Sequence, residues 1–200
     1  MTVYYYQLVA ANHNQTGYAV AKELAKQTLA QFGAVRGSGV GIGPGSCCAA
    51  VAVEPSQNIP AAHPLTGFGG ATTPQYGSTT LPYGVVFGNS QLAQGGLDLG
   101  PLGGHAERAT LTAAGNYHLQ LYLLNQKDAI LYVELTPCSD CQKWLSGGGG
   151  GVPNPFNFST NHLNLHVWWS FNYPGTTGVD EMNQFHNDTL PNQLTTANSW

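Results

Sequence analysis

The sequence Ala129-Ile130-Leu131-Tyr132-Val133-Glu134-Leu135-Thr136-Pro137-Cys138-Ser139-Asp140-Cys141 joins an apolar run to a pair of cysteines. The apolar run, which ends shortly before a proline, predicts a buried strand over 129–135. Pro137 has no backbone N–H to lose and suits the start of a helix, so a short helix is expected over 138–145. A buried strand followed at once by a helix is typical of α/β proteins.

Similar patterns elsewhere in the chain predict further strands and helices. The strands are expected over 47–53, 83–88 and 163–171, and the helices over 17–33, 106–114 and 179–190. Residues 54–82 are rich in Pro, Gly and Thr and are expected to form a long irregular excursion, whereas 117–126 is ambiguous. This order predicts an α/β fold with a mixed central sheet of about five strands and helices packed on both faces. No repeat or second boundary is evident, so 1–200 is interpreted as a single domain.

The composition limits the partners that the protein can bind. Charged residues make up 8% of the chain, and the net charge of −4 includes six cations in all. Gripping a long duplex through its phosphates takes about 6–10 cationic contacts on one face, which argues against wide electrostatic binding of nucleic acid. The sequence has no apolar stretch long enough to predict a transmembrane helix and no signal-peptide pattern at its start. We therefore expect no membrane partner.

The four cysteines fall into two pairs. Cys47 and Cys48 are adjacent within an apolar run, and adjacent cysteines rarely satisfy disulfide geometry. They are interpreted as buried free thiols, which indicates a reduced working environment. Cys138 and Cys141 are three residues apart and share one face of the expected helical turn.

A second short segment complements these two cysteines. His105 and Glu107 are two residues apart, so they would point about 200° away from each other within a helix. Both can face one site if His105 caps the helix, and glycines at 103 and 104 allow that tight entry. One imidazole and two thiolates can hold zinc and leave a fourth position open, which is the pattern of a catalytic metal site.

Alternatives to a catalytic zinc remain open on the sequence alone. A structural zinc would need a fourth ligand, for which His118, His162 and His166 are candidates. A non-catalytic module stabilised by zinc is a further alternative.

The two segments together resemble the cytidine deaminase-like superfamily. The resemblance is carried by 104–109 (Gly-His-Ala-Glu-Arg-Ala) and 132–142 (Tyr-Val-Glu-Leu-Thr-Pro-Cys-Ser-Asp-Cys-Gln). It extends over about 17–190 by element order. It implies zinc on His105, Cys138 and Cys141, with Glu107 as the group that moves protons between water, the ring nitrogen and the departing amine.

Within that superfamily, the sequence is similar to deaminase domains of bacterial polymorphic toxins, on the evidence of 138–145, the glycine-rich loop after it and the strand containing 167–169. Such domains end large secreted proteins and deaminate cytosine in nucleic acid. The resemblance implies an effector delivered to the cytoplasm of a target cell and an immunity protein as partner. DNA is the favoured substrate, RNA is a second choice, and free cytidine or deoxycytidine is the main alternative.

Several residues are expected to contact the substrate. Family members often hold the base with an asparagine that ends an upstream strand, and Asn89 fits that place. The other candidates are Ala106, Pro137, Trp144 and Trp168. Aromatic side chains can hold a flipped or single-stranded cytosine by stacking, which contributes about 1–3 kcal/mol per base and needs little charge. Trp168 and Trp169 alternate along a strand, so at least one of them is expected in the core.

Overall fold

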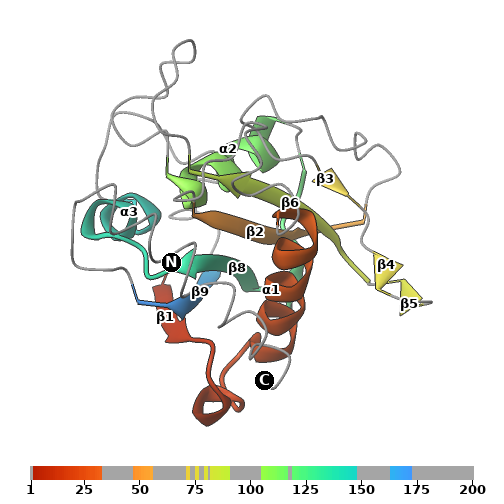
Figure 1. Ribbon diagram of the computed structural model, residues 1–200, viewed down its shortest axis with the longest axis horizontal. Coiled ribbons are helices and arrows are strands. Elements are labelled where there is room, and N and C mark those ends of the chain that lie inside the picture. The colour runs from red at the N-terminus through yellow and green to blue at the C-terminus, as the bar shows by residue number, and fades with distance from the viewer. Residues whose placement is uncertain are drawn as a thin grey trace.

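The computed structural model of the protein describes residues 2–32, 47–55, 71–72, 75–76, 79–80, 82–90, 105–116, 119–147 and 163–172. These residues form a mixed β-sheet with helices on both faces, so the predicted α/β class is confirmed (Figure 1). The predicted helix over 179–190 lies outside the described residues, as do most of 54–82 and the glycines at 103 and 104.

Within the described residues, the sheet has seven strands rather than about five. In spatial order they are β1 (Thr2–Gln7), β9 (Asn164–Phe171), β8 (Asp128–Leu135), β2 (Cys48–Val53), β6 (Gly84–Asn89) and β3 (Ala71–Thr72), with β7 (Leu123–Leu124) paired to β8. The three strands β1, β9 and β8 are parallel, and the remaining pairings are antiparallel. Two further strands, β4 (Gln75–Tyr76) and β5 (Thr79–Thr80), pair only with each other.

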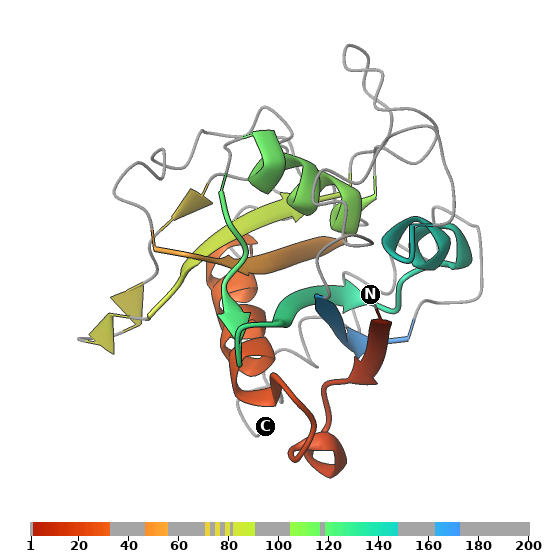
Figure 2. The same cartoon turned by 180° about the vertical axis from the view of Figure 1, so that it is seen from behind.

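Helices cover the two faces of this sheet. On one face lies α1 (Tyr18–Phe32), which follows a short 3-10 helix, η1 (Ala10–Asn12). On the other face lie α2 (Ala106–Asn116) and α3 (Ser139–Leu145), as the two opposite views show (Figures 1 and 2). Within the described residues, none of the helices combines the length and the apolar character needed to cross a membrane.

The central strands are apolar on both sides because helices cover both sides. Along β8, Leu131 and Val133 pack in the core beneath α2 and α3, whereas Ile130 and Tyr132 pack in the core beneath α1. All eight residues of β8 are buried, and so are all six of β2 and of β6. A strand buried on both faces has a continuous apolar sequence, which explains why these strands could be located from composition.

The direction of the strands brings the starts of α2 and α3 to one edge of the sheet. β2 lies between β6 and β8 and is antiparallel to both, so β6 and β8 run in the same direction. The chain enters α2 after β6 and enters α3 directly after β8. Carboxyl ends of strands that share a direction lie at the same edge, which is where α/β proteins commonly bind ligands.

α2 packs very closely on β6, and Gly88 makes this approach possible. A Cβ atom at Gly88 would lie 2.5 Å from the backbone nitrogen of Thr110 and 2.9 Å from its Cα. Thr110 is fully buried, and its hydroxyl donates to the carbonyl of Ala106 at 2.8 Å. The absence of a side chain at Gly88 therefore sets how near the first turns of α2 lie to the sheet.

The predicted elements differ from the observed ones at a few positions. α2 continues through Gly115 to Asn116, because a single glycine within a packed helix costs only about 1 kcal/mol relative to alanine. The irregular excursion over 54–82 contains the short strands β3, β4 and β5, and the ambiguous segment contains β7. The strand β1 was not predicted, although Val3-Tyr4-Tyr5-Tyr6 has the β-branched and aromatic composition that favours strands.

Candidate metal centre

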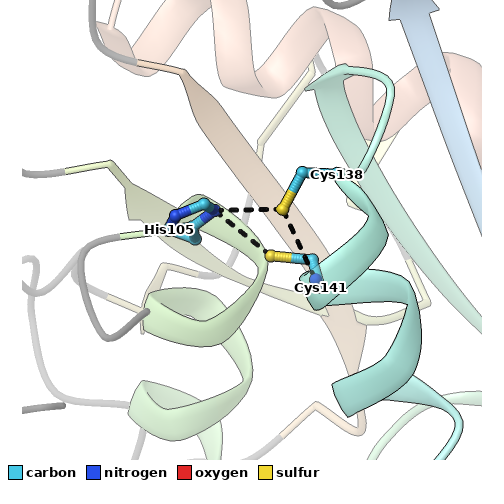
Figure 3. Close-up of side chains that lie close together, drawn as sticks. All are labelled: His105, Cys138 and Cys141. Atoms are coloured by element: carbon cyan, nitrogen blue, oxygen red, sulfur yellow. Dashed lines mark hydrogen bonds between the residues drawn. The ribbon is translucent and has the colours of Figure 1, made fainter. Parts of the chain in front are cut away.

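His105 occupies the position immediately before α2. The backbone N–H of Ala109 donates to the carbonyl of His105 at 3.0 Å, which is the first hydrogen bond of the helix. His105 therefore caps α2, as the spacing of His105 and Glu107 predicted. The imidazole is partly exposed, and it projects from the start of the helix toward α3 (Figure 3).

Cys138 caps the facing helix, α3. Its backbone is extended, with φ −64° and ψ 163°, and its sulfur accepts a hydrogen bond from the backbone N–H of Cys141 at 3.4 Å. Cys141 lies in the first turn and is fully buried. Pro137 precedes the cap instead of occupying the first helical position, and its carbonyl accepts a hydrogen bond of 2.8 Å from Gln142 Nε2. The predicted helix is thus correct, with its start displaced by one residue.

The three side chains converge on one point between the two helix starts (Figure 3). His105 Nδ1 lies 3.6 Å from Cys138 Sγ and 3.3 Å from Cys141 Sγ, and all three ligand atoms lie within 4.8 Å of one another. Zinc bonds of about 2.3 Å to sulfur and 2.0–2.1 Å to nitrogen, at a tetrahedral angle, place N and S ligands about 3.6 Å apart. The two N···S separations are close to this value, so His105, Cys138 and Cys141 form a cluster that could bind a metal ion.

The protonation states of the two cysteines differ in the metal-free cluster. A hydrogen bond from Cys141, together with one from His105, lowers the pKa of Cys138 to about 3, although partial burial opposes this shift. The pKa of Cys141 is raised because its thiol donates to Cys138 and because it is buried near Glu107. The pKa of His105 is raised, chiefly by its hydrogen bond to Cys138. A cation bound at the centre would favour the thiolate form of both sulfurs.

Glu107 lies beside the cluster without belonging to it. Its carboxyl group is buried, with a relative exposure of 5% for the residue, and Oε2 accepts a weak hydrogen bond from Cys141 Sγ at 3.6 Å. Burial is the largest cause of a raised pKa for this carboxyl group. A buried carboxyl group with a raised pKa next to a metal-binding cluster is a candidate for a group that accepts and donates protons.

Two of the expected substrate contacts lie close to the cluster, and both are buried. Ala106 is the first residue of α2, and Trp144 lies three residues after Cys141 in α3. Both are at least 98% buried within the core beneath α2 and α3. Asn89 ends β6 as expected and is buried, and its described hydrogen bond is a long one, 3.4 Å from Nδ2 to the carbonyl of Ser90.

Trp168 is not brought to the cluster. It is fully buried in the core on the α1 face of the sheet, where its ring packs against Tyr6 and Tyr18. The alternation of side chains along β9 places the neighbouring Trp169 on the opposite face, where it is partly exposed. Trp168 is therefore a core residue, and the structure gives it no contact with the candidate site.

His166 is also on the α1 face, so it is not a fourth ligand of this cluster. Its Nε2 lies 3.0 Å from Asp128 Oδ1, and its ring stacks on Tyr4 at a centroid distance of 4.9 Å. The other two histidines considered as fourth ligands, His118 and His162, lie outside the described residues. Within the described part of the chain, the cluster has three protein ligands.

The structure reveals one neighbour of the cluster that sequence reasoning missed. The guanidinium of Arg108 lies over the indole of Trp144, 4.9 Å from the ring centroid, and both side chains are buried. The sequence contained a signal for this contact, because Arg108 is the one cation of α2 and most of its neighbours in the helix are small or apolar. Cys47 and Cys48 are free thiols as predicted, but Cys47 is only partly buried and precedes β2.

Comparison of the chain with protein-family models, with curated proteins and with solved structures finds no match in any of the three.

Proposed function

We propose that this protein is a zinc-dependent deaminase that converts cytosine to uracil in DNA, acting on an unpaired or flipped-out base. One observation carries the proposal. Three ligand atoms from His105, Cys138 and Cys141 lie at the spacing of a tetrahedral zinc site, and a buried carboxyl group that is not needed as a ligand lies 3.6 Å from one of them. Three protein ligands and an adjacent carboxylate are the set of groups that hydrolytic deamination requires.

The roles of the residues follow from their chemistry. Zinc, when bound, supplies a Lewis acid that makes a coordinated water more acidic. Glu107 accepts a proton from the attacking water and donates it to the ring nitrogen of cytosine. Glu107 then accepts the second proton from the hydroxyl group that has been added to the ring carbon and donates it to the departing amine, so that cytosine and water become uracil and ammonia. Burial raises the pKa of Glu107, and this shift favours the donating step, because a carboxyl group with a higher pKa holds the accepted proton more readily.

The choice of substrate rests on the aromatic and cationic side chains of the protein. Trp169 is partly exposed on the face of the sheet that α3 covers, so it is available to stack on a base. Trp168 is buried in the core on the other face and is not available for stacking. The chain has six cations, too few for wide phosphate contacts, and this favours a short footprint of a few nucleotides. The same scarcity of cations favours free cytidine or deoxycytidine as the second candidate substrate. RNA is a third candidate.

A role as a bacterial toxin domain belongs to the same proposal. Its support is the resemblance of 138–145 and 167–169 to toxin deaminases. An enzyme that damages nucleic acid in a target cell would need a dedicated inhibitor in the producing cell, so an immunity protein is the expected partner. Its binding would be expected to abolish the activity measured below.

The test is to incubate the zinc-loaded protein with single-stranded DNA, duplex DNA, RNA and free cytidine, and to measure uracil by digestion and mass spectrometry. We expect uracil in DNA. Uracil from free cytidine alone would overturn the nucleic-acid substrate, and inosine formed from adenine would overturn the choice of base. The absence of any deaminated product would overturn the reaction.

Glu107→Gln tests the role of the carboxylate separately. We expect the rate to fall by about 10²–10⁴-fold, the usual contribution of general acid–base catalysis, while one zinc ion per chain is retained. Asp140→Asn is the matched control, because Asp140 is an exposed carboxylate in the first turn of α3 that pairs with Lys143 at 3.9 Å. Loss of zinc from Glu107→Gln would show that Glu107 is a ligand and would refute its assigned role.

A further inference from the structure

The contact between Arg108 and Trp144 joins the two helices that carry the metal ligands. Arg108 follows Glu107 on α2, and Trp144 lies one turn after Cys141 on α3. The guanidinium carbon is 4.9 Å from the indole centroid, and the two residues are only 3% and 2% exposed. The contact uses neither a metal ligand nor Glu107, and it forms without a bound metal.

The two helix starts need such a connection because different strands anchor them. α2 packs on β6 and β2, whereas α3 follows β8, and β2 separates β6 from β8 in the sheet. Adjacent strands are about 4.8 Å apart, so the anchoring strands are roughly 10 Å apart. His105 must nevertheless stay 3.3–3.6 Å from both sulfurs. A small rotation of either helix would open the cluster.

We propose that Arg108 and Trp144 are positioning residues of the metal centre, which hold the starts of α2 and α3 at the separation that a tetrahedral metal site requires. A cation over an indole face is attracted by the ring quadrupole, and the attraction is strongest when both groups are removed from water, as they are here. The proposal rests on the metal site of the proposed function, but it does not depend on the reaction.

The test measures metal binding and not activity. Zinc-free protein is titrated with Co²⁺, whose visible absorption reports the ligand geometry, and zinc affinity is then measured by competition. We expect Arg108→Met to weaken zinc binding on the order of tenfold, within the range of about 10–100-fold typical for groups that orient metal ligands, and to alter the Co²⁺ spectrum. Arg108→Lys should restore part of both, because an ammonium group can also lie over the indole.

A double-mutant cycle separates positioning from simple loss of packing. If the two residues act through their contact, Arg108→Met and Trp144→Leu together should weaken binding by less than the product of the single effects. Lys143→Met is the control, because Lys143 is a cation on α3 beside Trp144 whose side chain is 70% exposed. It removes one positive charge, as Arg108→Met does, but from the exposed surface of the facing helix, and it should change neither the zinc affinity nor the Co²⁺ spectrum.

Wild-type zinc affinity and an unchanged Co²⁺ spectrum in Arg108→Met would overturn the proposal. Should this variant fail to fold, Arg108→Lys and Trp144→Phe take its place, and wild-type affinity in both would overturn it equally. Weakened binding in the variants, found together with a wild-type protein that forms no uracil, would support the positioning role and refute the proposed function. The positioning role and the proposed function can therefore be refuted independently of each other.

Discussion

Replacing Gly88 with alanine should displace α2 and impair the metal centre, although Gly88 contacts no ligand. The added Cβ would lie 2.5 Å from Thr110 N and 2.9 Å from Thr110 Cα. Non-bonded carbon atoms prefer separations of about 3.5 Å or more, so α2 would have to retreat from β6 by roughly 1 Å. The added Cβ would also crowd the side-chain Oγ1 of Thr110, but N and Cα belong to the backbone, so no change of rotamer at Thr110 can relieve the whole contact.

The magnitude follows from this displacement. Inserting a methyl group into a packed core typically costs about 1–3 kcal/mol. For a chain of this size that lowers the melting temperature by roughly 2–12 °C. The ligands of a metal site tolerate displacements of only about 0.5 Å. A shift of α2 should therefore move His105 away from the two sulfurs and weaken zinc binding by roughly tenfold or more.

The assay combines thermal unfolding of the zinc-free protein with competitive zinc titration. Gly147→Ala is the control, because Gly147 lies just beyond α3 with φ +80° and has no atom near its added Cβ. It should cost stability through its backbone conformation and leave zinc affinity unchanged. Since the clash with Thr110 involves its backbone, Thr110→Ala should not rescue Gly88→Ala. Rescue by Thr110→Ala, or unchanged zinc affinity in Gly88→Ala, would refute the reasoning.

Two further predictions follow from ionisation. Of the two cysteines, only Cys141 should release a proton when zinc binds at pH 7, because Cys138 has a pKa of about 3 and is already a thiolate, whereas the pKa of Cys141 is raised. His105, whose pKa is also raised, adds to the total release, so the cysteine contribution is read from the variants. Calorimetry in buffers of different ionisation enthalpy measures the release, and an equal loss of released protons in Cys138→Ser and Cys141→Ser would contradict the prediction. Burial alone would raise the pKa of Asp128, but hydrogen bonds from Asn164 and His166 outweigh it, so the pKa lies below its usual value. The ionised Asp128 therefore contributes to the free energy of unfolding, fully above pH about 4, and this contribution is lost as the pH falls through the folded-state pKa. In Asp128→Asn the free energy of unfolding should lack this acid-dependent contribution. Urea unfolding between pH 3 and 7 checks it, and identical pH profiles for the two proteins would count against it.

Local patterns made the central elements predictable from the sequence. The strand at 128–135 and the helix that begins after Cys138 were located to within a residue, because an apolar run buried on both faces and a proline before a cap are local signals. The strand β1 was missed. It lies at the edge of the sheet and is only partly buried, so its sequence lacks a continuous apolar run.

The roles of the two tryptophans show where local reasoning ends. Alternation along β9 required Trp168 and Trp169 to face opposite sides, but it could not assign either one to the side of the metal centre. That assignment depends on the pairing of β9 with β8, in which Trp169 lies beside Val133 on the face covered by α2 and α3. The sequence therefore proposed a substrate contact at Trp168, and the fold places that residue in the opposite core.

The sequence by itself determined the chemistry of the candidate centre and its local geometry. The spacing of Cys138 and Cys141 sets two sulfurs on one helical turn, and the spacing of His105 and Glu107 requires a cap, because backbone geometry fixes both relations. Only the tertiary structure decided that these two segments meet. Their meeting depends on β2 pairing antiparallel with both β6 and β8, which brings two helix starts to one edge of the sheet, and such long-range pairing leaves no periodic signal in the sequence. The contact of Arg108 with Trp144 has the same origin.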